Sequence, residues 1–422
     1  MTEENQFEYE GNQQKVLAAA GMSRLAEPSD VIAKALVELY GSEEAYRFIA
    51  NTTHSIDGSM LQSMSELLEA WGEGKERKNL AEATLRWRSR VNHDAVKNSV
   101  RHIQRLGGGV LTPEDDGWPP QLLDLEYKAP FCLWWRGSFH PTLWPARNQM
   151  VNIVGSRDAT NYGTSTAVEL ASQLAEAGIT VVSGGAYGID AMAHRGALSF
   201  EDRDVATFPT IAVMAGGLDR YYPAGNAELL EEVRERGVLI SETPPGTAPT
   251  RWRFLQRNRL IAALTDATVV VEARWRSGAL STAHHALDMG RSVGAVPGPV
   301  NSASSQGCLK MIKDGAELIR DAQDVLLMLG KDDHYSPHST DLPFMKSDQR
   351  VHDQLSVTDL MLLDALPVRG WTDVDHIVGV AGLSVGAILG GLSRLQMQGL
   401  ARTRDGLWQK EYAKPAPAEQ KS

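Results

Sequence analysis

Six short apolar runs alternate with longer amphipathic stretches between about residues 149 and 325, and this feature constrains the fold more than any other. The runs are VNIVG, ITVVSGG, TIAVMAGG, GVLISE, ATVVVEA and SVGAVPG. Each run is followed by a stretch long enough for a crossover helix, and continuous apolar strands are typical of a parallel sheet covered on both faces. The pattern predicts an α/β fold with an extended, Rossmann-like, doubly wound parallel sheet.

The chain has 422 residues, which predicts more than one domain. Apolar residues recur every three or four positions between Asp30 and Leu80, which is typical of packed helices, and the basic segment that ends at Gly107 is interpreted as one further helix. Near the carboxyl end, three helical stretches precede a turn at Asp405 and Gly406. The predicted parts are a helical (SAM/HhH-like) domain over 20–85, the Rossmann-like core over 98–330, a linker over 331–354 and a winged helix over 355–412.

Cysteine usage and hydropathy predict a cytoplasmic location. Cys132 and Cys308 lie far apart in the chain, the first ten residues carry no basic segment, and no apolar run approaches the roughly 18 residues of a membrane span. His194 and the pair His284 and His285 lack metal-ligand spacing, and no GxxxxGK[ST] motif is present. We therefore expect no metal, no cofactor and no membrane partner.

Two glycine-rich loops follow the first two apolar runs of the core. The first loop contains Gly155, Ser156 and Arg157, and the second contains Ser183, Gly184, Gly185, Tyr187 and Gly188. Ligands of an open parallel sheet bind at the carboxyl ends of its strands, where glycine amides and helix N-termini attract anions. Tight turns alone also require glycine. The presence of two such loops together with an arginine favours a phosphate site.

The segment RWRFLQRNRLIAAL concentrates positive charge on one predicted helix. Arg253 and Arg257 stand four residues apart, and Arg251 and Arg259 lie beside them. Like charges at this spacing repel unless an anion or a carboxylate faces them. Because the whole chain has a net charge of −11, this cluster is a local exception. An extended anion is the preferred interpretation, and a solvated helix face with glutamate partners is the alternative.

The sequence leaves the roles of several other side chains open. Glu242, Glu272 and Asp190 stand at strand ends or helix starts, where general acid or base chemistry, helix capping and pairing with arginine are all compatible with the pattern. The tryptophans of the segment between Leu111 and Gly137 are interpreted as core anchors rather than base-stacking platforms.

Eight ordered blocks resemble the DprA/Smf family of DNA-processing proteins. They are VGSR, SGGAYGIDAMAHRGAL, AGGLDRYYPAGN, ISE, FLQRNRLIAAL, VVVEA, SGALSTAHHAL and VPG. The resemblance implies a helical amino-terminal domain, a Rossmann-like core that binds single-stranded DNA, and a carboxyl-terminal winged helix. It also implies protection of incoming single strands during natural transformation, loading of a RecA-type recombinase on them, and action as a homodimer without enzymatic activity.

Carried over by position, the resemblance gives a predicted set of DNA-binding residues. The set is Gly155, Ser156, Arg157, Ser183, Gly184, Gly185, Tyr187, Gly188, Arg253, Arg257, Asn258 and Arg259. Two positions depart from the family pattern. Tyr187 replaces an expected basic residue and offers a ring for stacking, and Leu309 stands where a Gly-x-Asn pattern would place asparagine after Gly307.

Two other functions compete with DNA binding at the sheet. A nucleotide phosphoribohydrolase would use Glu272 or Glu242 with an arginine, but its PGGxGTxxE signature is missing from residues 296–307. A transcription regulator would read an operator through the winged helix, whose presumptive recognition helix offers Arg394 as its one cation. We expect that domain to contact protein rather than DNA.

Overall fold

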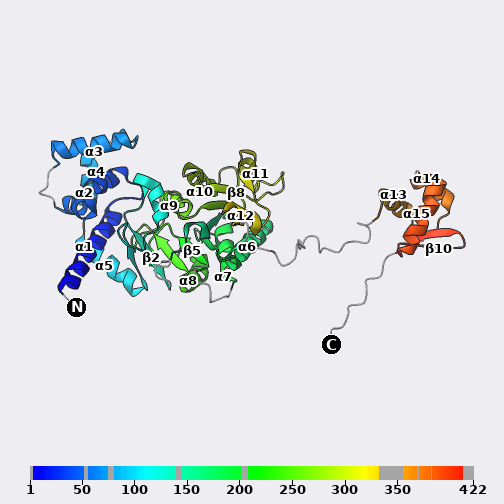
Figure 1. Ribbon diagram of the computed structural model, residues 1–422, viewed down its shortest axis with the longest axis horizontal. Coiled ribbons are helices and arrows are strands. Elements are labelled where there is room, and N and C mark those ends of the chain that lie inside the picture. The colour runs from blue at the N-terminus through cyan, green and yellow to red at the C-terminus, as the bar shows by residue number, and fades with distance from the viewer. Residues whose placement is uncertain are drawn as a thin grey trace, which may run out of the picture. The chain divides into compact units, whose positions relative to one another are not determined.

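We describe the chain from a computed structural model (Figure 1). The described residues are 3–51, 56–74, 80–138, 144–200, 208–331, 355–367, 370–381 and 383–411. The chain divides into two compact units, Met1–Tyr335 and Ser336–Ser422, and each is described by itself. Apart from Lys331, the predicted linker over 331–354 lies outside the described residues.

The six apolar runs form the six parallel strands at the centre of the first unit. These strands are β3 (Met150–Val154), β4 (Thr180–Ser183), β5 (Thr210–Val213), β6 (Val238–Ser241), β7 (Ala267–Val270) and β8 (Ser292–Ala295). The side chains of β3 to β7 are all buried, because helices cover both faces of the sheet. The predicted α/β fold with a large parallel sheet is confirmed.

Strand order places the cleft of the sheet. The order is β1-β2-β6-β5-β4-β3-β7-β8-β9, so the chain runs outward from β3 in one direction and then crosses back to β7. Val151 of β3 is in register with Val181 on one side and Ala267 on the other. The loops after β3 and β7 leave in opposite directions at this switch point, and ligands of doubly wound sheets bind there.

The sheet continues beyond the predicted strands on both sides. Strands β1 (Gly108–Leu111) and β2 (Leu133–Gly137) add antiparallel to β6, and β9 (Glu317–Leu318) adds parallel to β8. The sequence pattern predicted no strand in these segments, which are short and carry no clear alternation. Trp134 lies in β2 and is fully buried, as expected for a core anchor. Between β1 and β3 lie η2 (Pro120–Lys128) and η4 (Arg147–Gln149).

Helices cover the sheet in two layers (Figure 1). One layer packs Leu170 and Ile189 against β3 and β4, and the other packs Ile261 and Ala283 against the opposite face. The first layer contains α6 (Asn161–Glu176), α7 (Ile189–Leu198), α8 (Ala227–Arg236) and α12 (Ala322–Met328). The second contains α9 (Arg251–Leu264), α10 (Gly278–Asp288) and α11 (Gln306–Lys313), and the short η5 (Ala224–Asn226) precedes α8.

The amino-terminal helices extend further than the sequence analysis predicted. They are α1 (Glu3–Leu25), α2 (Val31–Ala50), α3 (Gly58–Ala70), α4 (Leu80–Arg88) and α5 (His93–Arg105). The basic segment predicted as one helix is two, because Asn92 caps α5 by accepting a hydrogen bond from the amide of Ala95. Trp134 of the sheet donates to the hydroxyl of Ser23 in α1 at 3.2 Å, so the helices and the sheet share a buried contact.

The second unit contains α13 (Val357–Ala365), α14 (Val374–Ala381), α15 (Val385–Met397) and a hairpin of β10 (Ala401–Arg404) and β11 (Leu407–Lys410). Asp405 and Gly406 both have positive φ, as the two central residues of a type I′ turn require. The order of elements agrees with the sequence analysis, and the winged-helix assignment stays a prediction. No single helix of the described residues is long and apolar enough to cross a membrane; only α14 and α15, taken together across a bend, pass by length and composition.

Candidate functional site

Two cavities of about 380 Å³ each open at the carboxyl ends of the central strands. The switch-point cavity is lined by the loops after β3 and β7 and by the first turns of α9 and α10. The second cavity lies over the ends of β4 and β5 and the loop after β6. Phe254, in the first turn of α9, is half-buried and lines both cavities.

Arg157 lies exposed at the mouth of the switch-point cavity. Its guanidinium carbon lies 4.7 Å from the centre of the Phe254 ring, and the Tyr222 ring lies 5.7 Å from the same ring on the side of the second cavity. No carboxylate of the described residues forms an ion pair with Arg157. A cation held on an aromatic face and open to solvent keeps its N–H groups available for an anion.

Arg257 also lines the switch-point cavity, and its side chain is buried. Its Nη1 donates to the carbonyl oxygen of Gly184 at 2.7 Å and also to that of Val213. Burial lowers the pKa of Arg257 to about 10, while the nearby carboxylate of Asp190 opposes the shift, so the group stays charged at neutral pH. A Cβ on Gly184 would meet the guanidinium at 2.4 Å. The absence of a side chain at Gly184 therefore leaves room for the guanidinium of Arg257.

The structure corrects the prediction that Arg259 faces an extended anion, because a carboxylate of the chain itself faces it. Arg259 is 2% exposed, and its two terminal nitrogens donate to the two carboxylate oxygens of Glu242 at 2.9 and 2.6 Å. Its Nε donates to the carbonyl oxygen of Lys128. Two residues along a helix reverse the direction of a side chain, so Arg259 points away from the cavity that Arg257 lines. In this arrangement it cannot contact a phosphate.

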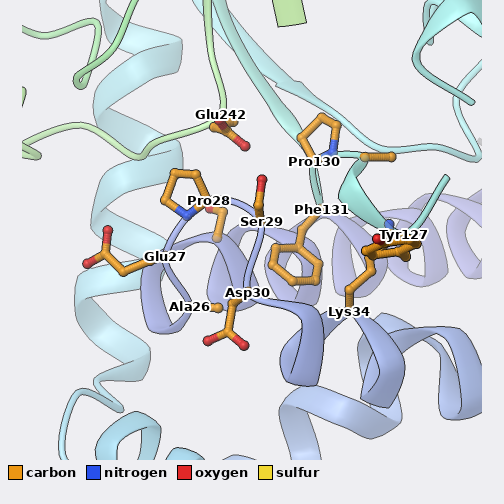
Figure 2. Close-up of a pocket in the computed structure, with 12 residues that line it drawn as sticks. Ala26, Glu27, Pro28, Ser29, Asp30, Lys34, Tyr127, Pro130, Phe131 and Glu242 are labelled. Carbon is orange, nitrogen blue, oxygen red and sulfur yellow. The ribbon is translucent and has the colours of Figure 1, made fainter. Parts of the chain in front are cut away.

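Arg253 is also paired within the chain. Its Nε and Nη2 donate to the carboxylate of Glu27, in the loop between α1 and α2, at 3.0 to 3.1 Å. Glu27 and Glu242 both border one small pocket between the amino-terminal helices and the core (Figure 2). A phosphate contact for Arg253 requires Glu27 to release it, so the alternative of glutamate partners applies to Arg253 and Arg259.

Both helix starts predicted to bind phosphate hold carboxylates of the chain itself. Glu272, at the end of β7, accepts from the amide and the hydroxyl of Thr160, which caps α6. Asp190, in the first turn of α7, accepts from the amides of Gly184 and Ala186. Burial raises the pKa of Asp190, and these amides oppose the rise. Both carboxylates therefore engage backbone amides beside the starts of α6 and α7, although Thr160 is the cap of α6 and α7 has no side-chain cap. Phosphate binding at these loops stays a prediction.

The remaining predicted residues shape the loops. Ser183 is buried and donates to the carbonyl oxygen of Ile153 at 2.7 Å. Asn258 accepts from Nε of Arg257 and donates to the carbonyl oxygen of Gly278, which ties α9 to the start of α10.

Gly155, Gly185 and Gly188 allow close backbone approach. Gly188 has φ of 75°, and a Cβ there would meet the carbonyl oxygen of Ser156 at 2.2 Å. Ser156 itself is buried, and its amide donates to the carbonyl oxygen of Glu272. Tyr187 is 48% exposed, and its hydroxyl accepts from the amide of Gly225.

Two residues of the site were not predicted from the sequence. Phe254 lines both cavities. Arg274 lines the switch-point cavity and forms a solvent-exposed ion pair with Asp158 at 2.8 Å. The three-residue spacing between Phe254 and Arg257 could have placed the ring on the arginine face of the helix. Among the described residues, no cluster of histidine, cysteine and carboxylate side chains could hold a metal ion.

Comparison with known proteins places this geometry in a family. The family described as DNA recombination-mediator protein A matches residues 109–330. A protein of Mycobacterium tuberculosis named DNA processing protein DprA is 42% identical over 330 residues, which covers 75% of this chain and 80% of the relative. The chain belongs to the DprA family.

Two further DprA proteins agree with this assignment. DNA processing protein DprA of Bacillus subtilis is 37% identical over 271 residues, or 61% of this chain and 88% of the relative. The X-ray structure of DNA processing protein A from Streptococcus pneumoniae superposes with a TM-score of 0.56 at 26% identity, over 74% of this chain and 97% of that one. DprA membership confirms the resemblance that the sequence blocks carried.

Proposed function

We propose that this chain binds single-stranded DNA across the two cavities at the carboxyl ends of the sheet. The observation that carries the proposal is Arg157, an exposed guanidinium held over Phe254 at the switch point of the sheet. A parallel sheet offers its ligand cleft at this place. The name of the family, which describes a mediator of DNA recombination, supports a nucleic acid as the ligand.

Phosphates would be held by guanidinium groups rather than by loop amides. Arg157 contacts one phosphate, and Arg274 joins it when its exposed pair with Asp158 opens, since such a pair contributes little in water. Arg220 lines the second cavity and is 91% exposed in its side chain. The buried guanidinium of Arg257, which lines the switch-point cavity, adds positive charge that attracts the phosphates. Because these contacts reach the backbone of the strand, binding is expected to tolerate different base sequences.

Loading of a RecA-type recombinase is part of this proposal, together with action as a homodimer in the cytoplasm. The sequence holds no GxxxxGK[ST] motif, so nucleotide hydrolysis for filament growth would come from the recombinase. The DprA chain would hand over the strand by binding alone. The competing enzymatic function is disfavoured because Glu242 and Glu272 are both buried and hydrogen-bonded within the chain.

Replacing Arg157 by alanine tests the proposal. We expect weaker binding of a dT oligonucleotide, and a slope of log affinity against log salt that is shallower by about 0.7, because each phosphate contact on a single strand contributes about that much. The thermal midpoint should stay nearly unchanged, since the side chain is exposed. Fluorescence anisotropy titrations at four salt concentrations measure both quantities.

The matched control is Arg195→Ala, an exposed arginine near the far end of α7, which should leave the slope unchanged. A duplex of the same length, titrated in parallel, should bind more weakly than the single strand. If Arg157→Ala and the wild type give the same slope and affinity, the assignment of Arg157 to DNA is rejected.

A further inference from the structure

The tripeptide Arg-Trp-Arg occurs at 86–88, 251–253 and 274–276, and the three copies differ in exposure. Trp87 is 1% exposed and donates its indole N–H to Asp30 in the helical domain. Trp252 and Trp275 are 55% and 61% exposed. Large aromatic side chains are seldom left this open in a folded chain, because their burial is favourable. The last two copies therefore leave open an aromatic surface that the first copy buries.

Neither exposed tryptophan lines the switch-point cavity itself, but each is close in sequence to residues that do. Trp252 stands one helical turn before Leu255, which lines that cavity and is itself 40% exposed. Trp275 lies in the loop between β7 and α10, between Arg274 and Ser277, which line the same cavity. Both tryptophans therefore belong to segments that line the cavity at which Arg157 is exposed.

The charge around these rings selects the kind of partner. Arg251 flanks Trp252, and Arg274 and Arg276 flank Trp275; all three arginines are exposed. A flat apolar ring between cations matches a nucleotide, whose base stacks on the ring while its phosphate meets the cation. The bases of a duplex are already paired and stacked, so only a single strand offers them.

We propose that Trp252 and Trp275 are stacking platforms for unpaired bases of the strand whose phosphates pass the switch-point cavity. This inference rests on the proposed function and adds a base contact to it. Stacking tolerates every base because each has a π face, so it strengthens binding without reading sequence. It also gives this site a preference for single strands that arginine contacts alone do not provide.

A strand that lacks bases distinguishes base stacking on the tryptophans from phosphate contact with the arginines. We expect the double variant Trp252→Ala with Trp275→Ala to bind a dT oligonucleotide at least about tenfold more weakly. Its affinity for an abasic deoxyribose-phosphate strand of the same length should not change, and its salt slope should stay that of the wild type. The Trp→Phe pair should retain most of the affinity because phenylalanine still stacks. Anisotropy titrations of both labelled strands measure these values.

The controls distinguish this inference from the proposed function and from misfolding. Leu287→Ala removes a 55% exposed side chain from the far end of α10 and should change neither strand's binding. Arg157→Ala should weaken both strands. If the wild type binds neither strand, the proposed function fails; if it binds both equally, only the stacking inference fails.

Two further outcomes would overturn stacking. One is an equal loss on both strands for the tryptophan variants, which would indicate a structural role. The other is a change of oligomeric state in sedimentation analysis, which would assign the tryptophans to contact with a second copy of the chain.

Discussion

His194 is completely buried beside the sheet and close to Arg257. Its Nδ1 lies 2.7 Å from the hydroxyl of Thr210, which donates to the carbonyl oxygen of Val181. Nδ1 must therefore carry the proton, and Nε2 has no hydrogen-bond partner among the described residues. Burial, with a smaller contribution from Arg257, lowers the pKa of His194 to about 3. His194 is thus a neutral imidazole packed in the core.

Neutral His194 should make stability depend on pH in the acid range. Its pKa is about 3 when folded and about 6.5 when unfolded, so the unfolded chain takes up the proton first. The free energy of unfolding should therefore fall as pH drops below about 6.5, by up to about 1.4 kcal/mol per pH unit from this group. Urea denaturation of wild type and His194→Gln between pH 5 and 7.5 measures it.

The His194→Gln variant should show a shallower pH dependence than the wild type, whatever its absolute stability. His284→Ala, which changes an exposed histidine of α10, should keep the wild-type dependence. Parallel curves for wild type and His194→Gln would contradict the assignment of a depressed pKa to His194.

Three arginines of one helix show how far a residue type determines a role. Arg253, Arg257 and Arg259 lie within seven positions, and their partners are Glu27, backbone carbonyl groups and Glu242 respectively. All of these partners lie in other segments of the chain. The charge cluster could be predicted from the sequence, but the group that answers each charge could not.

At the scale of elements, α9 connects the helical domain to the cavities. Thr250 caps it, Arg253 reaches back to Glu27, and Phe254 faces the cavities one residue later. Glu27 also approaches Arg90 at 3.7 Å. The loop between α1 and α2 therefore holds the guanidinium of Arg253, one residue before Phe254, which lines both cavities of the proposed DNA site.

Releasing that guanidinium should strengthen DNA binding. In Glu27→Gln the carboxylate charge is lost, so Arg253 becomes available to a phosphate. We expect tighter binding of a dT oligonucleotide and a salt slope steeper by up to about 0.7. The thermal midpoint should fall only slightly, because the pair is partly exposed to water. Anisotropy titration and thermal unfolding provide the two measurements.

The control Glu169→Gln removes an equal charge from the exposed side of α6 and should leave the slope unaltered. It separates release of Arg253 from the general gain that any lost negative charge gives. Weaker binding by Glu27→Gln would indicate that the pair with Glu27 positions Arg253 or Phe254 for DNA rather than withholding it.

At the scale of the whole molecule, the two units divide the described chain. All proposed DNA contacts belong to the first unit, Met1–Tyr335. In the second unit, Arg394 of α15 pairs with Asp359 through two hydrogen bonds of 2.7 and 3.1 Å. The one cation of the presumptive recognition helix is thus engaged within its own unit, which favours contact with protein over contact with a major groove.

Removing residues 336–422 should leave DNA binding intact. We expect the shortened chain to bind a dT oligonucleotide with wild-type affinity and salt slope, and to show the thermal unfolding transition of the first unit unchanged. Titrations with single-stranded and duplex oligonucleotides at two salt concentrations test this. A large loss of duplex affinity would instead assign duplex DNA binding to the second unit.

The sequence by itself determined the sheet and its cleft. Strand-length apolar runs and the stretches between them are local properties, so six parallel strands and the place of Arg157 at a strand end could be predicted. The short strands β1, β2 and β9 could not, because they form only by pairing with an existing sheet edge.

Only the tertiary structure decided which charges remain available. Glu272 and Asp190 engage backbone amides beside the starts of α6 and α7, and Glu27 and Glu242 hold Arg253 and Arg259, while Arg157 stays open on Phe254. Each pairing joins groups that the fold brings together from separate segments. Electrostatic interactions depend on distance and burial in space, and the order of residues along the chain does not contain these quantities.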